Sequence, residues 1–364
     1  MMNSSWPNNS SEEARSPSSA VSQTVSGSTT ASQVIYSIVS LVALLGNTLV
    51  ILVFIFDKKL LKKSYNTLIF SLAIADVLTA MSLITNPAFV LGDSFPYPTG
   101  PVLGELFCRL IWSRAILFQL VVFSVYICLA LTAERWFAVV KPHKYNDAFS
   151  RKKITCYIFS SWVCAFLSAG SGMIETVYRA SPNKICEFQF IAGGSVLRVV
   201  IGVFQSVVKM AFPCATMMGL YIHMIYTVKM SAAASAASKV KLRSRMTRIV
   251  GVVCCTLIIC YAPNQILWVF ALAGKVESDS EVHHATALLT FVASCVNPVI
   301  YGLSNSNYRE RYKEILVTAY HRVCGGRASQ ANQPSVAGAN GRQPRVHPGP
   351  QQKDIPQKKN PLKM

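Results

Sequence analysis

The sequence predicts an all-α integral membrane protein, a bundle of seven transmembrane helices with a short amphipathic eighth helix. Of its 364 residues, 52% are hydrophobic and only 14% are charged, whereas soluble proteins carry roughly 25% charged residues. The apolar residues are gathered into runs long enough for a membrane span of about 20 residues. The alternating pattern of a membrane β-barrel is absent from these runs.

Seven apolar runs follow one another, and each predicts one membrane-spanning helix. They are 34–56, 66–91, 106–140, 154–174, 196–228, 249–273 and 285–303. The second, third and fifth runs exceed what a bilayer requires, so we expect those helices to tilt or to extend into water. No internal repeat at a fixed period is present. The sequence therefore predicts one helical domain, residues 34–322.

The stretch NYRERYKEILVTAYHRV after the last run predicts a helix lying on the inner membrane surface. Its apolar face holds Tyr308, Tyr312, Ile315, Leu316 and Ala319. Residues 323–364 are rich in Gly, Pro, Gln and Lys and predict a disordered tail. Cys324 is a candidate palmitoylation site beside the membrane, with a plain reduced thiol as the alternative.

Positive charge is concentrated on one side of the predicted membrane. The segments that follow the first, third and fifth runs hold four, five and six Lys or Arg residues, whereas the opposite side holds few. Positive loops stay in the cytoplasm, so the N-terminus is expected outside and the C-terminus inside. The charge is explained by this topology and by anionic membrane lipid, and nucleic acid is not expected as a partner.

The first 33 residues are polar and rich in serine, which predicts a disordered extracellular segment. No cleavable signal peptide is visible, so the first span is expected to act as its own insertion signal. Glycosylation sequons lie at Asn3, Asn8 and Asn9, and we expect at least one of them to carry a glycan.

Two of the eleven cysteines are expected to form a disulfide. Eight cysteines lie within the predicted spans, where a thiol is usually an apolar filler. Only Cys108 and Cys186 lie on the extracellular side, and two thiols in an oxidising compartment form a natural pair. Their bond would tie the top of the third helix to the loop between the fourth and fifth helices.

Polar residues and prolines recur, one helix at a time, in specific short motifs. These are GNTLV with Asn47, SLAIAD with Asp76, AERW with Arg135, Trp162 alone, FPCATMMGLY with Pro213 and Tyr221, CYAP with Pro263, and NPVIY with Asn297, Pro298 and Tyr301. Together with the cysteine pair, they resemble the motifs of the rhodopsin-like G-protein-coupled receptors. The resemblance covers all seven spans and the eighth helix. One motif alone would be weak, but the full set in this order is specific.

The resemblance implies roles for residues on the cytoplasmic side. Arg135 is expected to pair with Glu134 at rest and to meet the C-terminal helix of a heterotrimeric G protein in the active state. Tyr221 and Tyr301 match the two tyrosines that turn inward and support the open cavity. The alternative is that Glu134 and Arg135 have no functional role and simply lie at the membrane boundary, where the free-energy cost of a charged side chain is small.

Three prolines each remove a backbone hydrogen bond and so predict a kink. They are Pro213, Pro263 and Pro298. The resemblance implies that the kink at Pro263 is a pivot on which the sixth helix swings outward. A static kink is the alternative, because membrane helices tolerate proline.

Asp76 lies in the middle of the second span, where a carboxylate is costly and functional by default. The resemblance implies that it belongs to an allosteric sodium pocket with Ser124, Ser294 and Asn297. A hard cation with oxygen ligands would stabilise the ionised acid. The alternative is a protonated Asp76 that bonds to Asn47 and Asn297. No other metal or cofactor is expected.

The sequence departs from the family's pattern at several points. Arg135 follows Cys108 by 27 residues (135 minus 108), about two more than the pattern has, which predicts a bulge in the upper third helix or a shifted bridge. Tyr261 and Trp136 stand where the resemblance leads us to expect Trp and Tyr. The foot of the sixth helix, KVKLRSRMTR, offers no acidic partner to Arg135, so raised basal activity is a hypothesis.

Two ligand classes are excluded by the residues present. Retinal needs a Schiff-base lysine in the seventh helix, but 285–303 contains none and Phe291 lies near the expected place. Biogenic amines need a carboxylate in the upper third helix, and no acidic residue occurs between Glu105 and Glu134.

The predicted ligand pocket is basic and rich in amides. Besides Phe291, it comprises Arg114, Gln119, Gln205, Lys209, Asn264 and Gln265. Lys209 could bind a carboxylate, or it could reach the surface by snorkelling. A partly acidic outer rim would instead attract a basic peptide; its residues are Glu175, Glu187, Glu277, Asp279 and Glu281. A neuropeptide-type ligand is the prediction, and a small carboxylic acid or lipid is the alternative.

Other classes of function fit the sequence less well. A transporter usually shows repeats and matching broken helices, and none are visible. The motifs HExxH and GxSxG and paired intramembrane carboxylates are absent, so the protein is not expected to be an enzyme. The prediction is a receptor in the plasma membrane. Arrestin is a possible further partner, although only Ser329 and Ser335 follow Cys324 as hydroxyl acceptors.

Overall fold

The computed structural model describes residues 30–91, 95–98, 100–181, 184–189, 195–232, 237–276, 280–304 and 306–331. Its contacts divide the chain into two units, residues 1–317 and residues 318–364. The first unit holds the helix bundle. Within the described residues, the second unit holds the last part of one helix and is not placed relative to the first.

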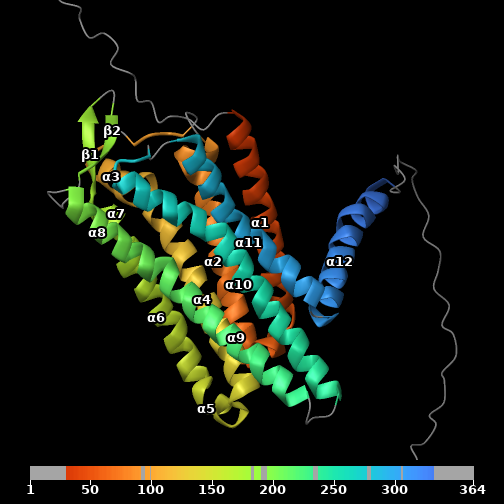
Figure 1. Cartoon of the computed structure of the whole chain (residues 1–364). Coiled ribbons are helices and arrows are strands. Elements are labelled where there is room, and N and C mark those ends of the chain that lie inside the picture. Colours follow the sequence, from red (N-terminus) through yellow and green to blue (C-terminus); the bar gives the residue numbers. More distant parts are fainter. Residues whose placement is uncertain are drawn as a thin grey trace, which may run out of the picture. The chain divides into compact units, whose positions relative to one another are not determined.

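All seven predicted runs form helices (Figure 1). They correspond to α1 (Thr30–Phe56), α2 (Ser64–Thr85), α4 (Ala115–Val140), α6 (Arg151–Ala169), α8 (Ser195–Ser206) with α9 (Phe212–Ala232), α10 (Ala237–Leu272) and α11 (Glu281–Ser304). Within the described residues, all of these segments except α6 are long and apolar enough to cross a membrane. Helix α6 is more polar because it begins with three basic residues and contains several serines.

The helices pack in a closed ring, in which α4 also contacts α6 and α10. Contacts join α1 to α2, α2 to α4, α4 to α6 and α9, α9 to α10, α10 to α11, and α11 back to α1. Gly46 lets α1 approach α11 closely, since a Cβ at this position would lie 3.0 Å from the Pro298 ring. The side chains of α4 fill the centre, and α4 contributes more buried residues to the largest apolar cluster than any other helix. Residues on α4 can therefore contact most of the bundle.

Three of the long predicted runs are interrupted by π-helical turns. Helix α2 ends at Thr85 because Pro87 forces Asn86 into an extended conformation, and a π-helix, Pro87–Leu91, follows. The third run forms α3 (Pro101–Leu106), a π-helix (Phe107–Trp112) and then α4. The fifth run contains a π-helix at Val207–Ala211.

The break before α4 confirms the predicted bulge in the upper third helix. The π-helix contains Cys108, and Arg114 then adopts a left-handed backbone, with φ 61°. A residue with a Cβ pays an energetic cost at positive φ. The chain takes up the additional residues between Cys108 and Arg135 in this segment, and α4 continues regularly to Val140.

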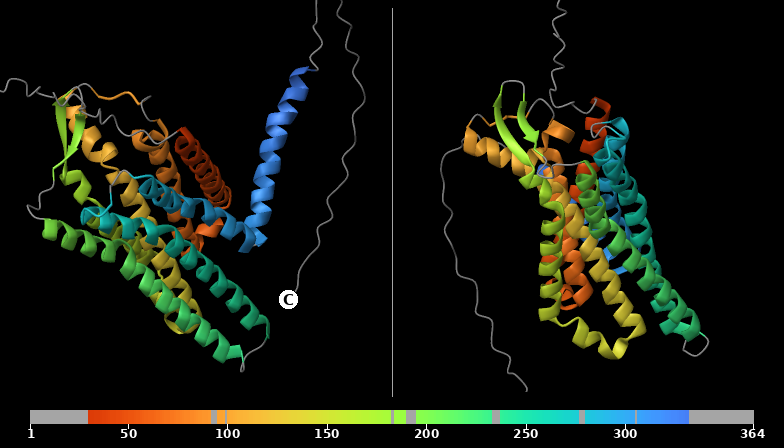
Figure 2. Two further views of the ribbon diagram at one scale, coloured as in Figure 1. Left: turned by 45° about the horizontal axis from the view of Figure 1, so that its top comes forward. Right: turned by 60° about the vertical axis from the view of Figure 1, so that its left-hand side comes forward.

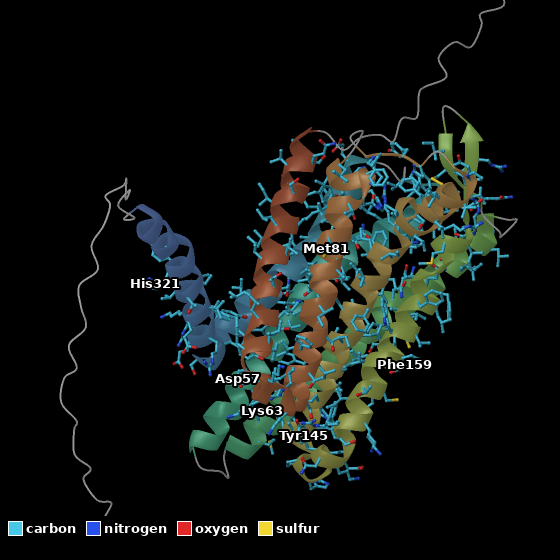
Figure 3. The ribbon with its side chains drawn as sticks, turned by 180° about the vertical axis from the view of Figure 1, so that it is seen from behind. Asp57, Lys63, Met81, Tyr145, Phe159 and His321 are labelled. Atoms are coloured by element: carbon cyan, nitrogen blue, oxygen red, sulfur yellow. A yellow bond between two sulfur atoms is a disulfide. The ribbon has the colours of Figure 1, made fainter. Side chains whose placement is uncertain are left out.

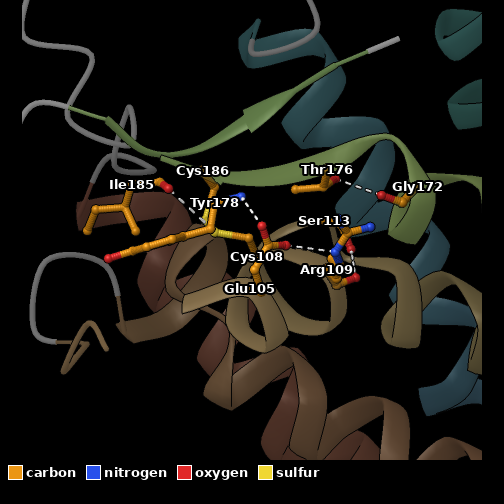
Figure 4. Close-up of a disulfide and its surroundings, with 9 residues drawn as sticks. All are labelled: Glu105, Cys108, Arg109, Ser113, Gly172, Thr176, Tyr178, Ile185 and Cys186. Atoms are coloured by element: carbon orange, nitrogen blue, oxygen red, sulfur yellow. Dashed lines mark hydrogen bonds and ion pairs between the residues drawn. A yellow bond between two sulfur atoms is a disulfide. The ribbon is translucent and has the colours of Figure 1, made fainter. Parts of the chain in front are cut away.

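The loop between α6 and α8 forms a two-stranded antiparallel sheet instead of an irregular segment. After α7 (Ser171–Ile174) come β1 (Thr176–Ser181) and β2 (Lys184–Phe188). Cys186 on β2 is bonded to Cys108, with an S–S length of 2.02 Å, as predicted (Figure 4). The Tyr178 ring lies against Gly104 of α3, where a Cβ would collide with it. The hairpin thus covers this end of the bundle (Figure 2).

The opposite end of the bundle carries the short connections. Asp57, Lys63 and Tyr145 lie there together (Figure 3), in or beside the 3₁₀ helix Lys58–Lys62 and helix α5 (Tyr145–Ala148). Tyr308, in helix α12 (Ser306–Ala331), donates a hydrogen bond to the Asn66 Oδ1 atom at 2.8 Å.

The first half of α12 packs on the bundle more than the sequence predicted. Tyr308, Tyr312 and Ile315 join an apolar cluster with residues of α1, α2 and α11, whereas Leu316 is exposed. Helix α12 also continues to Ala331, past the predicted boundary at residue 322. At the other end, α1 begins at Thr30, four residues before the predicted boundary at residue 34.

Several predicted features lie outside the described residues. They are the sequons at Asn3, Asn8 and Asn9, most of the tail beyond residue 331, and Glu277 and Asp279 of the predicted rim. Cys324 lies within α12, but its side chain is also outside the described part of the chain.

Candidate functional site

Asp76 is at the centre of a buried polar cluster that joins three helices. Its side chain is 1% exposed. The Oδ1 atom accepts hydrogen bonds from Ser294 at 2.8 Å and Ser124 at 3.4 Å, and the Oδ2 atom accepts one from the Asn297 amide at 2.9 Å. The structure therefore brings together all four residues that the sequence assigned to a sodium pocket.

Asn47 connects α1 to the same cluster through the backbone. Its amide donates to the carbonyl oxygens of Ala43 and Ser294, at 2.9 and 3.0 Å. It does not bond to Asp76, as the protonated alternative supposed. The Asn47 Oδ1 atom is buried without a hydrogen-bond partner. The Asp76 carboxylate and the hydroxyls of Ser124 and Ser294 are oxygen ligands of the kind that a hard cation such as sodium takes.

Glu134 and Arg135 form an ion pair near the end of α4. The Arg135 Nε atom lies 2.6 Å from Glu134 Oε2, and the side chains are 18% and 0% exposed. Glu134 also accepts a hydrogen bond from the Tyr145 hydroxyl at 2.5 Å. A buried carboxylate needs such partners, because an unpaired charge away from water is costly.

Tyr145 is kept protonated for this interaction. Burial, and then its hydrogen bond to Glu134, raise the pKa of Tyr145 to about 12. The hydroxyl is therefore a donor throughout the neutral range. This links the short helix α5, through one side chain, to the charged pair on α4.

The other face of Arg135 is covered by an aromatic ring. Its guanidinium carbon lies 4.1 Å from the centroid of Tyr65, in the first turn of α2. This distance is well within the range of a cation–π interaction. Arg135 is thus held by groups from α2 and α4.

The two tyrosines predicted to turn inward are placed differently from each other. Tyr221 on α9 is half-buried and lies over Gly251 of α10, where a Cβ would collide with its ring. Tyr301 on α11 is buried, and its hydroxyl has no hydrogen-bond partner in the described part of the chain. In this structure the two hydroxyls do not bond to each other.

The predicted hinge prolines lie where the sequence placed them. Pro263 and Pro298 are inside α10 and α11. Pro213 lies in the first turn of α9, immediately after the π-helix rather than in the middle of a regular helix. Tyr261, two residues before Pro263, is buried within the apolar core. The sequence predicted that its hydroxyl needs a partner, but no hydrogen bond is found for it among the described residues.

Lys209 belongs to a polar chain near the hairpin end of the bundle. Its Nζ atom lies 3.2 Å from the Gln205 Oε1 atom, and the Gln205 amide donates to the Ser171 hydroxyl at 3.0 Å. Among the described carboxylates none lies within ion-pair distance of Lys209. Burial raises the pKa of Glu175, and the positive charge of Lys209 partly offsets this rise.

Arg114 belongs to a second group of pocket residues. Its guanidinium carbon lies 5.1 Å from the ring centroid of Phe89, and Phe89 contacts Phe291 with centroids 5.6 Å apart. Tyr36 packs on both rings. Arg114 and Phe291, which were predicted for the same pocket, are therefore joined through this aromatic cluster.

The remaining predicted pocket residues are not joined to either group. Gln119 is half-buried, and no hydrogen bond from it is found within the described residues. The Asn264 Nδ2 atom and the Gln265 Oε1 atom are buried and have no hydrogen-bond partner among the described residues. Buried amide groups of this kind are costly when unpaired. Their hydrogen-bonding capacity is available to a ligand.

Two residues of the site escaped the sequence analysis. Tyr65 and Tyr145 lie in short stretches near the ends of helices, and neither belongs to a motif that was singled out. Their contacts with Arg135 and Glu134 join positions 70 and 11 residues apart (135 minus 65, and 145 minus 134). Basic loop sequence around aromatic residues is the only signal, and by itself it does not indicate which charge the ring contacts.

Comparison with known proteins supports the same class of protein. The profile of the 7 transmembrane receptor (rhodopsin family) matches residues 46–301. Melatonin receptor type 1A of Phodopus sungorus is 26% identical over 310 residues, covering 80% of this chain and 81% of the relative. Somatostatin receptor type 5 of Bos taurus is 26% identical over 306 residues (83% and 80%). The Allatostatin-A receptor of Bombyx mori is 26% identical over 296 residues (78% of each chain).

The seven-helix fold and the buried motif residues define a membrane receptor rather than an enzyme. The family match spans 256 residues (301 minus 46, plus 1), which is more than two thirds of the 364 residues. The chain belongs to the rhodopsin family of seven-transmembrane receptors.

The hydrogen bond from Tyr145 to Glu134 can be tested by removing one hydroxyl group. Tyr145→Phe should lower the free energy of unfolding by about 1.5–3 kcal/mol, because it takes a donor from a buried charge. Tyr157→Phe is the matched control, since that hydroxyl donates to a neutral carbonyl, Ala148 O, at 3.0 Å; it should cost about 0.5–1.5 kcal/mol. Thermal unfolding of the purified receptor measures both, and equal losses would contradict the expectation.

Proposed function

We propose that this chain is a plasma-membrane receptor that passes the binding of an extracellular peptide to a heterotrimeric G protein. The observation that carries the proposal is the ion pair of Arg135 with the fully buried Glu134, at the end of α4. An arginine held in this way, beside water and the basic loops, is poised to exchange its partner for a group on a cytoplasmic protein.

The orientation of the receptor follows from its charges. At the Tyr145 end, the 3₁₀ helix contains Lys58, Lys59 and Lys62 and is followed by Lys63, and basic loops remain in the cytoplasm. The disulfide-linked hairpin then lies outside, where thiols are oxidised. We assign residues 1–33 to the extracellular side and residues 323–364 to the cytoplasmic side. Glycosylation at Asn3, Asn8 or Asn9, palmitoylation at Cys324 and binding of arrestin belong to the same proposal.

A peptide is the favoured class of ligand. Among the relatives are a somatostatin receptor, an Allatostatin-A receptor and a QRFP-like peptide receptor of Branchiostoma floridae. The unpartnered amide atoms of Asn264 and Gln265 suit the backbone groups of a peptide. The second candidate is a small carboxylic acid or a lipid acid. It is favoured by Lys209, whose ammonium bonds only to a neutral amide among the described groups.

We also propose that a sodium ion binds at Asp76 in the resting receptor. Four oxygen-bearing side chains meet there, and the bundle interior holds no competing cation within hydrogen-bond distance among the described residues. An ionised carboxylate at this depth needs a positive partner. When bound, the ion would supply that charge, while Ser124, Ser294 and Asn297 orient the carboxylate toward it.

Signalling through Arg135 is tested in cells that express the receptor without added ligand and then with a peptide panel. Arg135→Ala should abolish any second-messenger output, because the group that meets the G protein is gone. Arg151→Ala is the matched control, since Arg151 is an exposed cation at the start of α6, and it should leave the output unchanged. Output that survives in Arg135→Ala at equal surface expression would contradict the G-protein role.

Recognition of a carboxylate by Lys209 is tested with somatostatin-type and Allatostatin-A-type peptides, each prepared as a free acid and as an amide, and with fatty acids. Lys209→Met should reduce the potency of an acid agonist by about 10- to 100-fold and leave amides unaffected, since one charge-assisted bond is lost. Lys229→Met, an exposed lysine in the last turn of α9, is the control. An equal loss of potency for acids and amides would contradict the assignment of Lys209 as the group that binds a carboxylate.

Sodium binding is tested by thermal unfolding in sodium chloride and in choline chloride at equal ionic strength. Wild-type receptor should be stabilised in sodium by about 1–2 kcal/mol at concentrations several times the Kd. Asp76→Asn should remove this difference, because the ion loses its only charged ligand. If the variant retains the same sodium dependence, the ion binds elsewhere.

A further inference from the structure

Among the described side chains, the resting partners of Arg135 all come from one side of the bundle. Glu134 on α4 provides the charge, at 2.6 Å, and Tyr65 on α2 provides an aromatic face, at 4.1 Å. The guanidinium is thus bonded at its edge and covered on its face. Only 18% of the arginine side chain remains exposed.

Helices α9 and α10 can provide no acidic partner. The sequence contains no Asp or Glu between Glu187 and Glu277, so α8, α9 and α10 are free of acidic residues. An ion pair between Arg135 and the swinging helix is therefore impossible. The described contact that restrains Arg135 beyond its own neighbour comes from α2.

The Tyr65 ring is suited to this restraint. A guanidinium over an aromatic face is attracted by the negative potential of the ring, and the attraction grows when water is excluded. Tyr65 is half-buried, in the first turn of a helix that is anchored by Asp76 and by the Asn66–Tyr308 bond. In the described part of the chain its hydroxyl makes no hydrogen bond, so the ring itself is the part that acts.

We propose that Tyr65 is a positioning residue that holds Arg135 in the resting state and so limits signalling without ligand. The proposal rests on the G-protein role of Arg135. To reach a G protein, the guanidinium must leave the ring, and the ring therefore favours the resting population. A contact made in only one of two states shifts the balance toward that state.

The signalling test compares two substitutions at the same position. Tyr65→Leu removes the aromatic face and should raise ligand-independent signalling by about three- to tenfold at equal surface expression. Tyr65→Phe keeps the face and should signal like wild type. Phe70→Leu is the control for losing a ring on α2: Phe70 packs on Phe54, with centroids 5.6 Å apart, and its loss should leave basal signalling unchanged. Arg135→Ala combined with Tyr65→Leu should be silent.

A second measurement tests the contact without any signalling. The thermal stability of Tyr65→Leu, Arg135→Gln and the double variant forms a double-mutant cycle. The double variant should lose less stability than the sum of the single losses, because the two substitutions remove one shared contact. The cycles of Arg135→Gln with Tyr65→Phe and with Phe70→Leu should be additive.

The two measurements separate the ways in which the proposal can fail. Additivity in the Tyr65→Leu cycle would overturn the contact itself. Equal basal signals for Tyr65→Leu and Tyr65→Phe would overturn the restraint, even if the cycle shows coupling. If every variant is silent, the restraint is likewise overturned. Failure of the proposed receptor function is then recognised separately, when a peptide from the C-terminus of each class of G-protein α subunit binds neither wild type nor Tyr65→Leu.

Discussion

The bundle depends on how one buried carboxylate is satisfied. Asp76 accepts hydrogen bonds from α4 and α11, and Asn47 adds α1 through the backbone carbonyl of Ser294. In a membrane the helices gain no hydrophobic energy by associating, so polar contacts and close packing must hold them. The Asp76 cluster supplies such contacts to four of the seven spans. A change in the charge of Asp76 would therefore alter contacts of all four helices.

The end of the bundle that carries Tyr145 is also held by satisfying a buried carboxylate, but with different partners. Glu134 is completely buried and bonded to Arg135 and Tyr145, and Arg135 lies over Tyr65. These partners come from α2, α4 and α5, while α9 and α10 pack beside them through apolar side chains and Gly251. Charge thus fixes one half of this end, whereas the described contacts of the half expected to move are neutral: apolar packing and the hydrogen bond that the Trp136 Nε1 atom of α4 donates to the His223 Nδ1 atom of α9, at 3.2 Å.

The sequence predicted the seven helices, the cysteine pair and the importance of Asp76 because each depends on features that a single sequence carries, whereas the partners of Asp76 were implied by the resemblance to a known family. Apolar runs, positive loops and polar residues inside a span are visible without coordinates. The contacts of Tyr65 and Tyr145 were not predicted, since an aromatic residue near a helix end gives no sign of what its face or hydroxyl will meet. The hairpin was missed because its strands are short. The separation between Cys108 and Arg135, which is longer than the family's pattern has, indicated a bulge. It did not indicate the left-handed backbone at Arg114.

That left-handed residue connects the irregular part of the fold with the pocket. The disulfide at Cys108 holds the upper π-helix to β2, and Asn86 ties the same segment to α2 through the Ile111 carbonyl at 2.6 Å. With both sides held, the additional residues are taken up at Arg114, and its guanidinium lies over Phe89. A strained backbone persists only where its surroundings determine it. The position of the Arg114 cation at the edge of the aromatic cluster is thus a consequence of how the disulfide and the hairpin close this end of the bundle.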